Sequence, residues 1–432
     1  MTRQMKDSGI EWIGEIPADW DVKKTLSCLS MPITDGPHTT PELLSEGVPF
    51  VSAEAVSSGS GKIDFAHIRG YISEAFYNEC CKKYIPQKND IYMIKSGATT
   101  GKVAVVDTDI RFTIWSPLAV FRANPDKIQY KYLYYALQSH PYQKQIEDKW
   151  SFGTQQNIGM RVLEQIKLTV PPLSEQKKIA DYLDEKCGAI DEVIAKTEQS
   201  IEEYKKLKQS VITEAVTKGV RPNRKMKDSG IAWIGEIPKD WNINKIKRFL
   251  RYVSTKDKGN CEVLSLYREL GIVPKNSRND NHNVTAEDTS NYRFVRKGDF
   301  VINKMKAWQG SVAVSDFDGI VSPAYFVYEF ISNVFVKKYF HYLLRNKQYA
   351  KEFERLSGGI RIGQWDLPAI EFENTVCLVP SLPEQKEIAD YLDKKCAEID
   401  SLIEKKQQFL TELAIYKKSM IYEYVTGKKE VA

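Results

Sequence analysis

Residues 96–103, with the sequence SGATTGKV, combine two glycines, a lysine and three hydroxyl side chains in one short segment. A loop of this kind can hold phosphate groups through its backbone N–H groups and its lysine. It departs from a nucleotide-binding loop, because the spacing from Gly97 to Gly101 is one residue too short and Val103 replaces the Mg²⁺-binding residue. We therefore expect phosphate or base contacts rather than ATP binding, with a solvated hairpin as the alternative. The candidate residues are Lys95, Ser96, Thr99, Thr100 and Lys102.

Two further segments carry side chains that suit nucleic acid. The word GTQQN contains amides suited to bidentate contact with adenine, and its rough counterpart SGGIRIGQW contains an arginine suited to guanine or phosphate. A third loop interleaves basic, aromatic and amide side chains. These candidates are Gln155, Gln156, Asn157, Arg361, Lys304, Lys306, Trp308 and Gln309.

The charge distribution agrees with a nucleic-acid surface in the second half of the chain. Between Asn242 and Gly310 there are 14 lysines and arginines against 7 acidic residues, whereas the whole chain has a net charge of only +5. Such a basic stretch is compatible with a surface that faces phosphates. An ordinary solvated surface is the alternative interpretation.

Composition excludes several classes of protein. The chain has 432 residues, enough for about two to four domains. No apolar run approaches the roughly 20 residues of a membrane span, and no secretory signal is visible, so we expect a cytoplasmic protein without membrane association. The seven cysteines and five histidines are scattered without ligand spacing, which predicts reduced thiols and no metal site.

Two pairs of words repeat along the chain. Residues 5–24 and 226–245 share 15 of 20 positions, and residues 173–191 and 382–400 share 14 of 19. The first pair is offset by 221 residues and the second by 209, which indicates a domain duplication rather than a solenoid. Between the repeated words lie two unlike inserts.

The inserts predict an α+β fold. Short β-branched and aromatic runs at 90–94, 103–106, 299–302 and 324–330 are typical of strands, and each insert has one helical stretch, at 130–140 and 336–346.

The second repeated word begins a long heptad pattern in each half. We predict helices in residues 173–219 and 382–432 that pair antiparallel as a coiled coil, because so long a helix needs a partner for its apolar stripe. Packing of each helix on its own insert is the alternative. Lys208 and Lys417 interrupt the two seams at equivalent positions. The apolar seam residues are Leu183, Ile190, Ile194, Ile201, Val211, Leu392, Ile399, Ile403, Leu410 and Leu413.

The words MKDSGIEWIGEIPADW and LSEQKKIADYLDEKC, set around two variable inserts, resemble the specificity subunit of type I restriction-modification systems over nearly the whole chain. The resemblance implies two pseudo-symmetric target recognition domains, in residues 1–172 and 220–381, joined by the long antiparallel two-helix coiled coil. Each recognition domain would read one half of a bipartite DNA target, and the helices would set the spacer.

The word DGPHTTP at Asp35–Pro41 is similar to one that recurs in recognition domains of this family. Its Asp, Gly and two prolines specify a turn, and His38, Thr39 and Thr40 offer short side chains for hydrogen bonds in a DNA groove. A purely structural turn is the alternative.

The resemblance also implies the partners of the chain. A non-catalytic specificity subunit would bind double-stranded DNA, two modification (methyltransferase) subunits and ATP-dependent restriction subunits. The methyltransferases would dock on Trp12–Trp20, Trp233–Trp241 and the helices. S-adenosylmethionine, ATP and Mg²⁺ would be bound by the partners, with no cofactor in this chain, which lacks both an Asn/Asp-Pro-Pro-aromatic word and an F-x-G-x-G loop.

Two other functions remain open from the residues alone. One is a nucleotide-dependent DNA-processing enzyme built on residues 96–103, which ATP turnover by the purified chain would support. The other is a structural protein–protein adaptor, which would lack the steep salt dependence of DNA binding.

Overall fold

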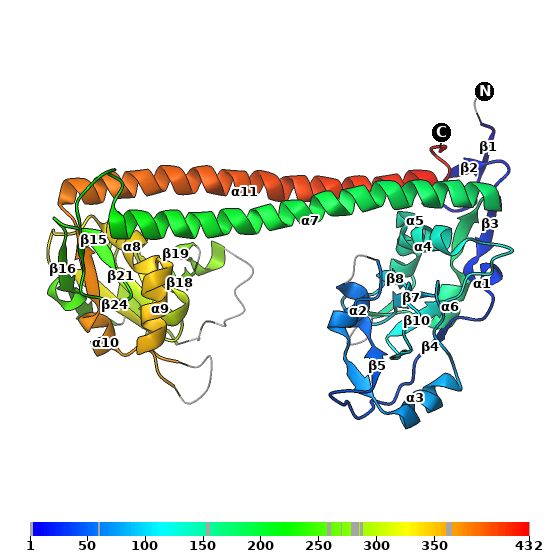
Figure 1. Ribbon diagram of the computed structural model, residues 1–432, viewed down its shortest axis with the longest axis horizontal. Coiled ribbons are helices and arrows are strands. Elements are labelled where there is room, and N and C mark those ends of the chain that lie inside the picture. The colour runs from blue at the N-terminus through cyan, green and yellow to red at the C-terminus, as the bar shows by residue number, and fades with distance from the viewer. Residues whose placement is uncertain are drawn as a thin grey trace. The chain divides into compact units, whose positions relative to one another are not determined.

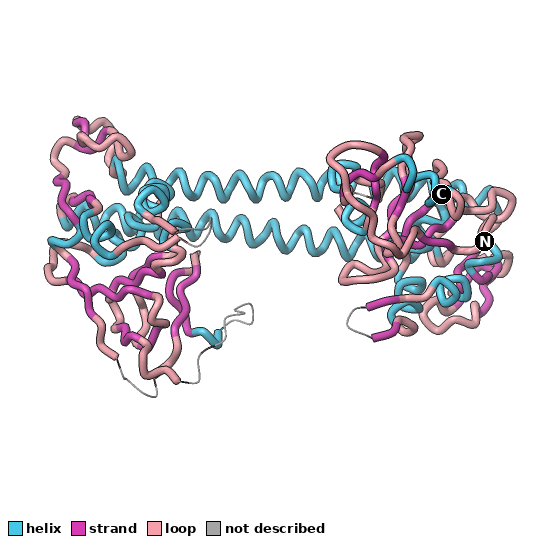
Figure 2. Tube along the Cα trace, turned by 90° about the horizontal axis from the view of Figure 1, so that it is seen from below, coloured by secondary structure: helices cyan, strands magenta, loops and turns pink. Residues whose placement is uncertain are grey.

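The chain folds into two compact units. The first unit comprises Met1–Glu198 and Gln407–Ala432, and the second comprises Gln199–Lys406. Each unit mixes helices with strands (Figures 1 and 2), which confirms the expected α+β class and the two repeated domains. The computed structural model describes residues 3–58, 61–152, 156–256, 261–268, 270–277, 285, 288–359 and 365–431. Within these ranges, no helix has the length and apolar character needed to cross a membrane.

The first unit is built around an antiparallel sheet with the strand order β4-β10-β7-β8. In β7, Ile91 and Met93 join one core cluster, whereas Tyr92 and Ile94 join another. Because both faces of this strand are covered, all four of its residues are apolar. The four strands are β4 (Thr34–Asp35), β10 (Leu118–Phe121), β7 (Ile91–Ile94) and β8 (Val103–Val105).

Smaller elements complete the first unit. The other strands are β1 (Met5–Asp7) with β2 (Glu15–Pro17), β3 (Asp21–Lys24) with β13 (Lys167–Val170), β11 (Ser151–Phe152) with β12 (Gln156–Asn157), and a sheet of β6 (Gly70–Ile72), β5 (Val48–Val51) and β9 (Thr113–Ile114). The short helices are α1 (Thr25–Cys28), α2 (Ala53–Ser57), η1 (Phe65–His67), α3 (Glu74–Cys81), α4 (Tyr130–Gln138), α5 (His140–Glu147) and α6 (Met160–Gln165).

The second unit repeats the central sheet in the order β17-β24-β21-β22, again antiparallel throughout. Its strands are β17 (Leu250–Val253), β24 (Tyr325–Phe330), β21 (Phe300–Asn303) and β22 (Val312–Val314). Helix α4 packs beside β8 in the first unit, and α8 (Lys337–Arg345) takes the equivalent place beside β22 in the second. The four strands and two helices that the sequence predicts in the inserts are therefore confirmed to within one or two residues at each end. The prediction of a single helical stretch in each insert is wrong: the first insert also contains α2, α3, α5 and α6, which are too short to show a helical period.

The remaining elements of the second unit differ more from those of the first. The strands are β14 (Met226–Asp228) with β15 (Glu236–Pro238), β16 (Asn242–Lys245) with β25 (Val376–Val379), β18 (Leu264–Tyr267) with β19 (Gly271–Pro274), and β20 (Arg293–Val295) with β23 (Gly319–Val321). The short helices are η2 (Ile246–Arg248), η3 (Lys275–Ser277), η4 (Ala307–Gln309), α9 (Lys347–Leu356) and α10 (Ala369–Asn374).

Two long helices, α7 (Leu173–Lys218) and α11 (Leu382–Val425), contribute to both units. Within the first unit the start of α7 contacts the end of α11, since the Tyr182 and Tyr424 rings lie 4.5 Å apart and Lys417 Nζ lies 2.5 Å from an Asp191 oxygen. These contacts run antiparallel.

Within the second unit the end of α7 contacts the start of α11 in the same sense. There Lys208 Nζ lies 2.6 Å from an Asp400 oxygen. The two lysines that interrupt the predicted seams therefore each face an aspartate on the other helix, at equivalent positions in the two units.

The predicted seam residues lie on the less exposed side of both helices. Leu183, Ile190, Ile201, Leu392 and Ile399 are buried, and Ile194, Val211, Ile403, Leu410 and Leu413 are partly buried. Next to Val211, Ile212 is the more buried residue.

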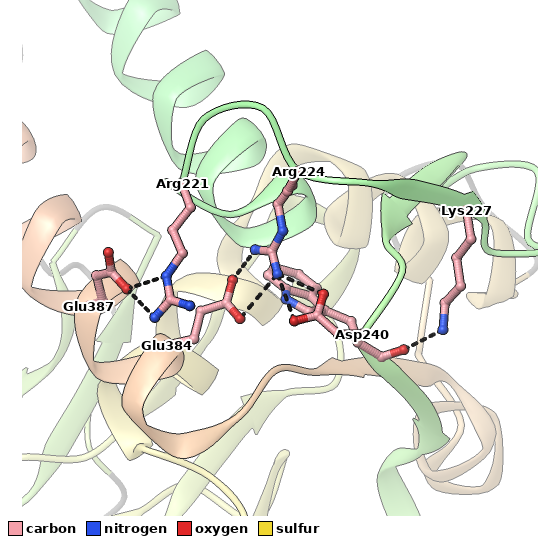
Figure 3. A network of polar contacts seen from close by, with 7 residues as sticks. Arg221, Arg224, Lys227, Asp240, Glu384 and Glu387 are labelled. Carbon is pink, nitrogen blue, oxygen red and sulfur yellow. Dashed lines mark hydrogen bonds and ion pairs between the residues drawn. The ribbon is translucent and has the colours of Figure 1, made fainter.

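A charged cluster fastens each repeated word to the beginning of a long helix. In the second unit Arg224 contacts both Asp240 and the buried Glu384, while Arg221 pairs with Glu387 (Figure 3). In the first unit Arg3 joins Asp19 and Glu175 in the same way, at positions offset by 221 and 209 residues.

A buried glutamine near the start of each long helix makes equivalent hydrogen bonds in the two units. Gln176 accepts a hydrogen bond from the Gln129 N–H at 2.8 Å and donates to the Pro171 carbonyl at 2.8 Å. Gln385 makes the equivalent bonds to Val336 and Pro380. Buried polar groups must be paired. The Glu-Gln motif therefore recurs at the start of both long helices, where the glutamine makes these hydrogen bonds.

Candidate nucleic-acid interface

The loop that joins β7 to β8 lies beside the segment that begins with β12. Gly97 N–H donates to the Gln156 carbonyl at 3.0 Å, and Ile158 N–H donates to the Lys95 carbonyl at 2.9 Å. Ser96 and Asn157 also form an isolated bridge. Two segments that the sequence singles out separately are thus one continuous feature of the first unit. Gln155 lies outside the described residues.

The second unit has the same pairing of loops. Leu367 N–H donates to the Lys304 carbonyl at 2.9 Å, and the Trp308 and Trp365 rings lie 5.5 Å apart. Lys304 Nζ lies 2.8 Å from an Asp366 oxygen. The loop after β21 therefore meets the segment that precedes α10. Arg361 lies outside the described residues.

The DGPHTTP segment joins the first of these sites through Asp35. This carboxylate is only 1% exposed, and its Oδ2 lies 3.3 Å from both Lys95 Nζ and His38 Nε2. Lys83 also pairs with Asp35. Gly36 is required here, because a Cβ atom would lie 2.0 Å from the Ile114 carbonyl oxygen. The segment thus has a structural role in Asp35 and Gly36, whereas the side chains of His38, Thr39 and Thr40 are exposed.

The other predicted contact residues differ in how freely they face solvent. Lys102 and Lys306 are exposed, and Ser96, Thr99, Gln156, Trp308 and Gln309 are partly exposed. Thr100 donates its hydroxyl proton to the Gly97 carbonyl at 2.7 Å, which uses that donor inside the loop. Trp308 Nε1 likewise donates to the Met305 carbonyl.

Four residues of these two sites are not among the contact residues predicted from the sequence: Asp35, Lys83, Trp365 and Asp366. The offset of 209 residues could have indicated the last two, since Trp365 and Asp366 stand where Gln156 and Asn157 stand in the first half. Lys83 has no such signal, because its link to Asp35 depends on how α3 is placed. In the parts of the chain that the structure describes, no cluster of His, Cys, Asp and Glu could hold a metal ion.

Comparison with known proteins gives a consistent result. The family model described as type I restriction modification DNA specificity domain matches residues 37–203 and 238–412. Two relatives from Methanocaldococcus jannaschii are the putative type I restriction enzyme MjaX specificity subunit, 29% identical over 97% of this chain and 96% of its own length, and the MjaVIII specificity subunit, 26% identical over 96% of this chain and 94% of its own.

The fold also matches a solved structure from work on complex assembly and conformational transition of the type I R-M system. The TM-score is 0.68 at 15% identity, with 96% of this chain and 99% of that chain covered. This similarity concerns the fold, whereas the family model covers both inserts and most of the two long helices. The chain therefore belongs to the family of type I restriction-modification DNA specificity proteins.

Proposed function

We propose that this chain is the non-catalytic subunit that selects the DNA sequence on which a type I restriction-modification complex acts. Each unit reads one half of a bipartite target in double-stranded DNA. The observation that carries this proposal is the duplicated loop pair. The same backbone contacts recur around Lys95 and Lys304, but the side chains at the two sites differ. Equivalent scaffolds with different contact residues are what two readers of different half-sites require.

The contact residues divide into two kinds. Lysines supply affinity through phosphates, which is independent of sequence. Gln156 and Asn157 in the first unit, and Gln309 with the tryptophan pair in the second, supply choice between bases, at about 1–3 kcal/mol for each good bidentate pair. Residues Thr39, Thr99 and Lys306 extend the two contact surfaces.

The long helices set the spacing of the readers in this proposal. Antiparallel contacts in each unit, with reciprocal Lys417–Asp191 and Lys208–Asp400 pairs, support an antiparallel two-helix coiled coil along α7 and α11. A stiff coiled coil would hold the two half-sites a fixed number of base pairs apart.

Two modification subunits would bind at equivalent places on the duplicated parts of the chain, which are the repeated segments and the two long helices. The support is that exposed apolar side chains recur at positions offset by 209 residues on α7 and α11. These pairs are Leu173 with Leu382, Val193 with Leu402, and Leu207 with Tyr416. The repeated words Trp12–Trp20 and Trp233–Trp241 lie in these repeated segments. S-adenosylmethionine, ATP and Mg²⁺ would then act in the modification and restriction subunits, in the cytoplasm.

The test is to coexpress the chain with its modification subunit and to map methylated adenines across a genome. We expect a single bipartite motif. Replacing residues 242–381 with the insert of another family member should change one half of that motif and leave the other half and the spacer unchanged. A change in both halves would contradict independent reading, and a lack of any sequence preference would contradict the function itself.

A further inference from the structure

Lys95 and Lys304 occupy the same place in the two units. They are separated by 209 residues, the offset of the second repeated word, and each directly follows a central strand, β7 or β21. The carbonyl of each accepts a hydrogen bond of 2.9 Å from the equivalent residue, Ile158 or Leu367. A lysine is thus kept at one position of two inserts that otherwise share little sequence.

Each of these lysines is held by a carboxylate, but the two carboxylates come from unrelated segments. Lys95 pairs with Asp35 at the end of β4, whereas Lys304 pairs with Asp366 in the segment before α10. The same ion pair is therefore built twice by different means.

In the first unit the charge balance favours an anion. One carboxylate faces the ammonium groups of Lys83 and Lys95 and the His38 ring. Because Asp35 is buried, it would be costly without a cation beside it, and it therefore fixes where those cations lie. Each ammonium has three N–H donors, so the shared carboxylate leaves donors available to a further acceptor. Lys83 and His38 are the more exposed members of the cluster.

We propose that Asp35 and Asp366 are positioning residues for the DNA backbone. Asp35 orders Lys83, Lys95 and His38, and Asp366 orders Lys304, so that each unit presents a fixed cationic contact to a phosphate at the same place relative to its reading loop. This inference rests on the proposed function and adds the residues that set the register of each reader. Phosphate contacts fix orientation on the duplex, and base contacts can be made only once that orientation is fixed.

The inference is tested by whether one substitution strengthens or weakens DNA binding. Asp35→Asn removes a negative charge, so simple electrostatics would tighten DNA binding, whereas loss of ordered cations should weaken it about 3- to 10-fold. Binding of the full chain is measured by fluorescence anisotropy with a duplex of about 40 base pairs that carries the mapped target, from roughly 50 to 200 mM salt. Lys83→Met should weaken binding similarly and reduce the log-log salt slope by about 1. Tighter or unchanged binding by a folded Asp35→Asn protein would overturn the proposal.

Further variants cover the second unit and a failure to fold. Asp366→Asn and Lys304→Met change partly exposed side chains, so the proposal stays testable there even if Asp35→Asn unfolds. Both should weaken binding several-fold. Lys82→Met is the matched control, because Lys82 adjoins Lys83 but pairs with the exposed Glu79. We expect the control to bind within about 2-fold of wild type with its salt slope nearly kept. Equal effects of the control and Lys83→Met would refute positioning, whereas a wild-type chain that fails to bind the duplex would refute the proposed function instead.

Discussion

Removal of the Arg224 guanidinium should destabilise the repeated segment 226–245 of the second unit. Arg224 is the counter-ion of Glu384, which is only 1% exposed, and it also bonds Asp240 at 2.7 Å (Figure 3). In Arg224→Met the carboxylate of Glu384 stays buried without a cation. Breaking a buried pair in this way costs about 3–5 kcal/mol, and because Asp240 is exposed we expect the lower end, about 3 kcal/mol.

The first unit provides an internal comparison for this magnitude. Glu175 is 21% exposed, and besides Arg3 it accepts a hydrogen bond from Trp20 Nε1 at 2.9 Å. The equivalent Trp241 Nε1 has no hydrogen-bond partner among the described residues. Glu175 therefore keeps a donor and some hydration when Arg3 is lost, and Arg3→Met should cost only about 1–2 kcal/mol.

Hydrogen exchange followed by mass spectrometry measures both effects in the intact chain. A loss of about 3 kcal/mol should speed exchange of the β14–β15 amides by about 100-fold in Arg224→Met, against about 10-fold for β1–β2 in Arg3→Met. Arg221→Met is the control, because the Arg221–Glu387 pair is half exposed, at 51% and 44%, and its loss should leave exchange near wild type. Equal acceleration in the two units, or none in Arg224→Met, would refute the reasoning from burial.

Two further predictions concern charge in the helices and pH. Asp191→Lys should destabilise the α7–α11 contact in the first unit, and adding Lys417→Asp should recover about 0.5–1 kcal/mol of the free energy of unfolding. The recovery is measured as the coupling energy of a double-mutant cycle in urea unfolding. Zero coupling would show that the pair contributes nothing. Burial, reinforced by Arg345 and Lys338, lowers the pKa of His341 from 6.5 to about 3. The folded state thus keeps the imidazole neutral while the unfolded state takes up a proton below pH 6.5, so stability should fall with pH from 6.5 toward 3. We expect the free energy of unfolding to fall by about 1–2 kcal/mol at pH 5, and this loss should be absent in His341→Asn. Asparagine is chosen because it still offers an acceptor to the Val314 N–H. An identical pH dependence of the urea midpoint in the two proteins would exclude His341 as the origin.

Local patterns were enough to predict two strands and one helix in each insert, but not the other short strands and helices. The run at 90–94 predicts a strand because it is rich in β-branched and aromatic residues, and β7 covers Ile91–Ile94. The seven-residue recurrence that includes Leu183 and Ile190 predicts a long helix, and α7 covers it. Both signals depend on neighbours in sequence, so they can be read without knowing the fold.

The seam lysines show where local patterns are insufficient. In the sequence Lys208 and Lys417 are interruptions of an apolar stripe. In the structure each faces an aspartate on the other helix, Asp400 or Asp191. The pairing partner depends on the register between two helices about 200 residues apart in the chain, which no local periodicity fixes.

By itself, the sequence determined the duplication, the two long helices and the short list of side chains that suit DNA, because each of these is recorded in residue type and spacing. Only the tertiary structure decided which side chains share a site, including some that are not on that list. Asp35, Lys83 and Lys95 come from three separate segments, and the strand order β4-β10-β7 together with the placement of α3 brings their charges within contact. Ion pairs form between atoms that are close in space, and closeness across a sheet depends on strand register rather than on distance along the chain.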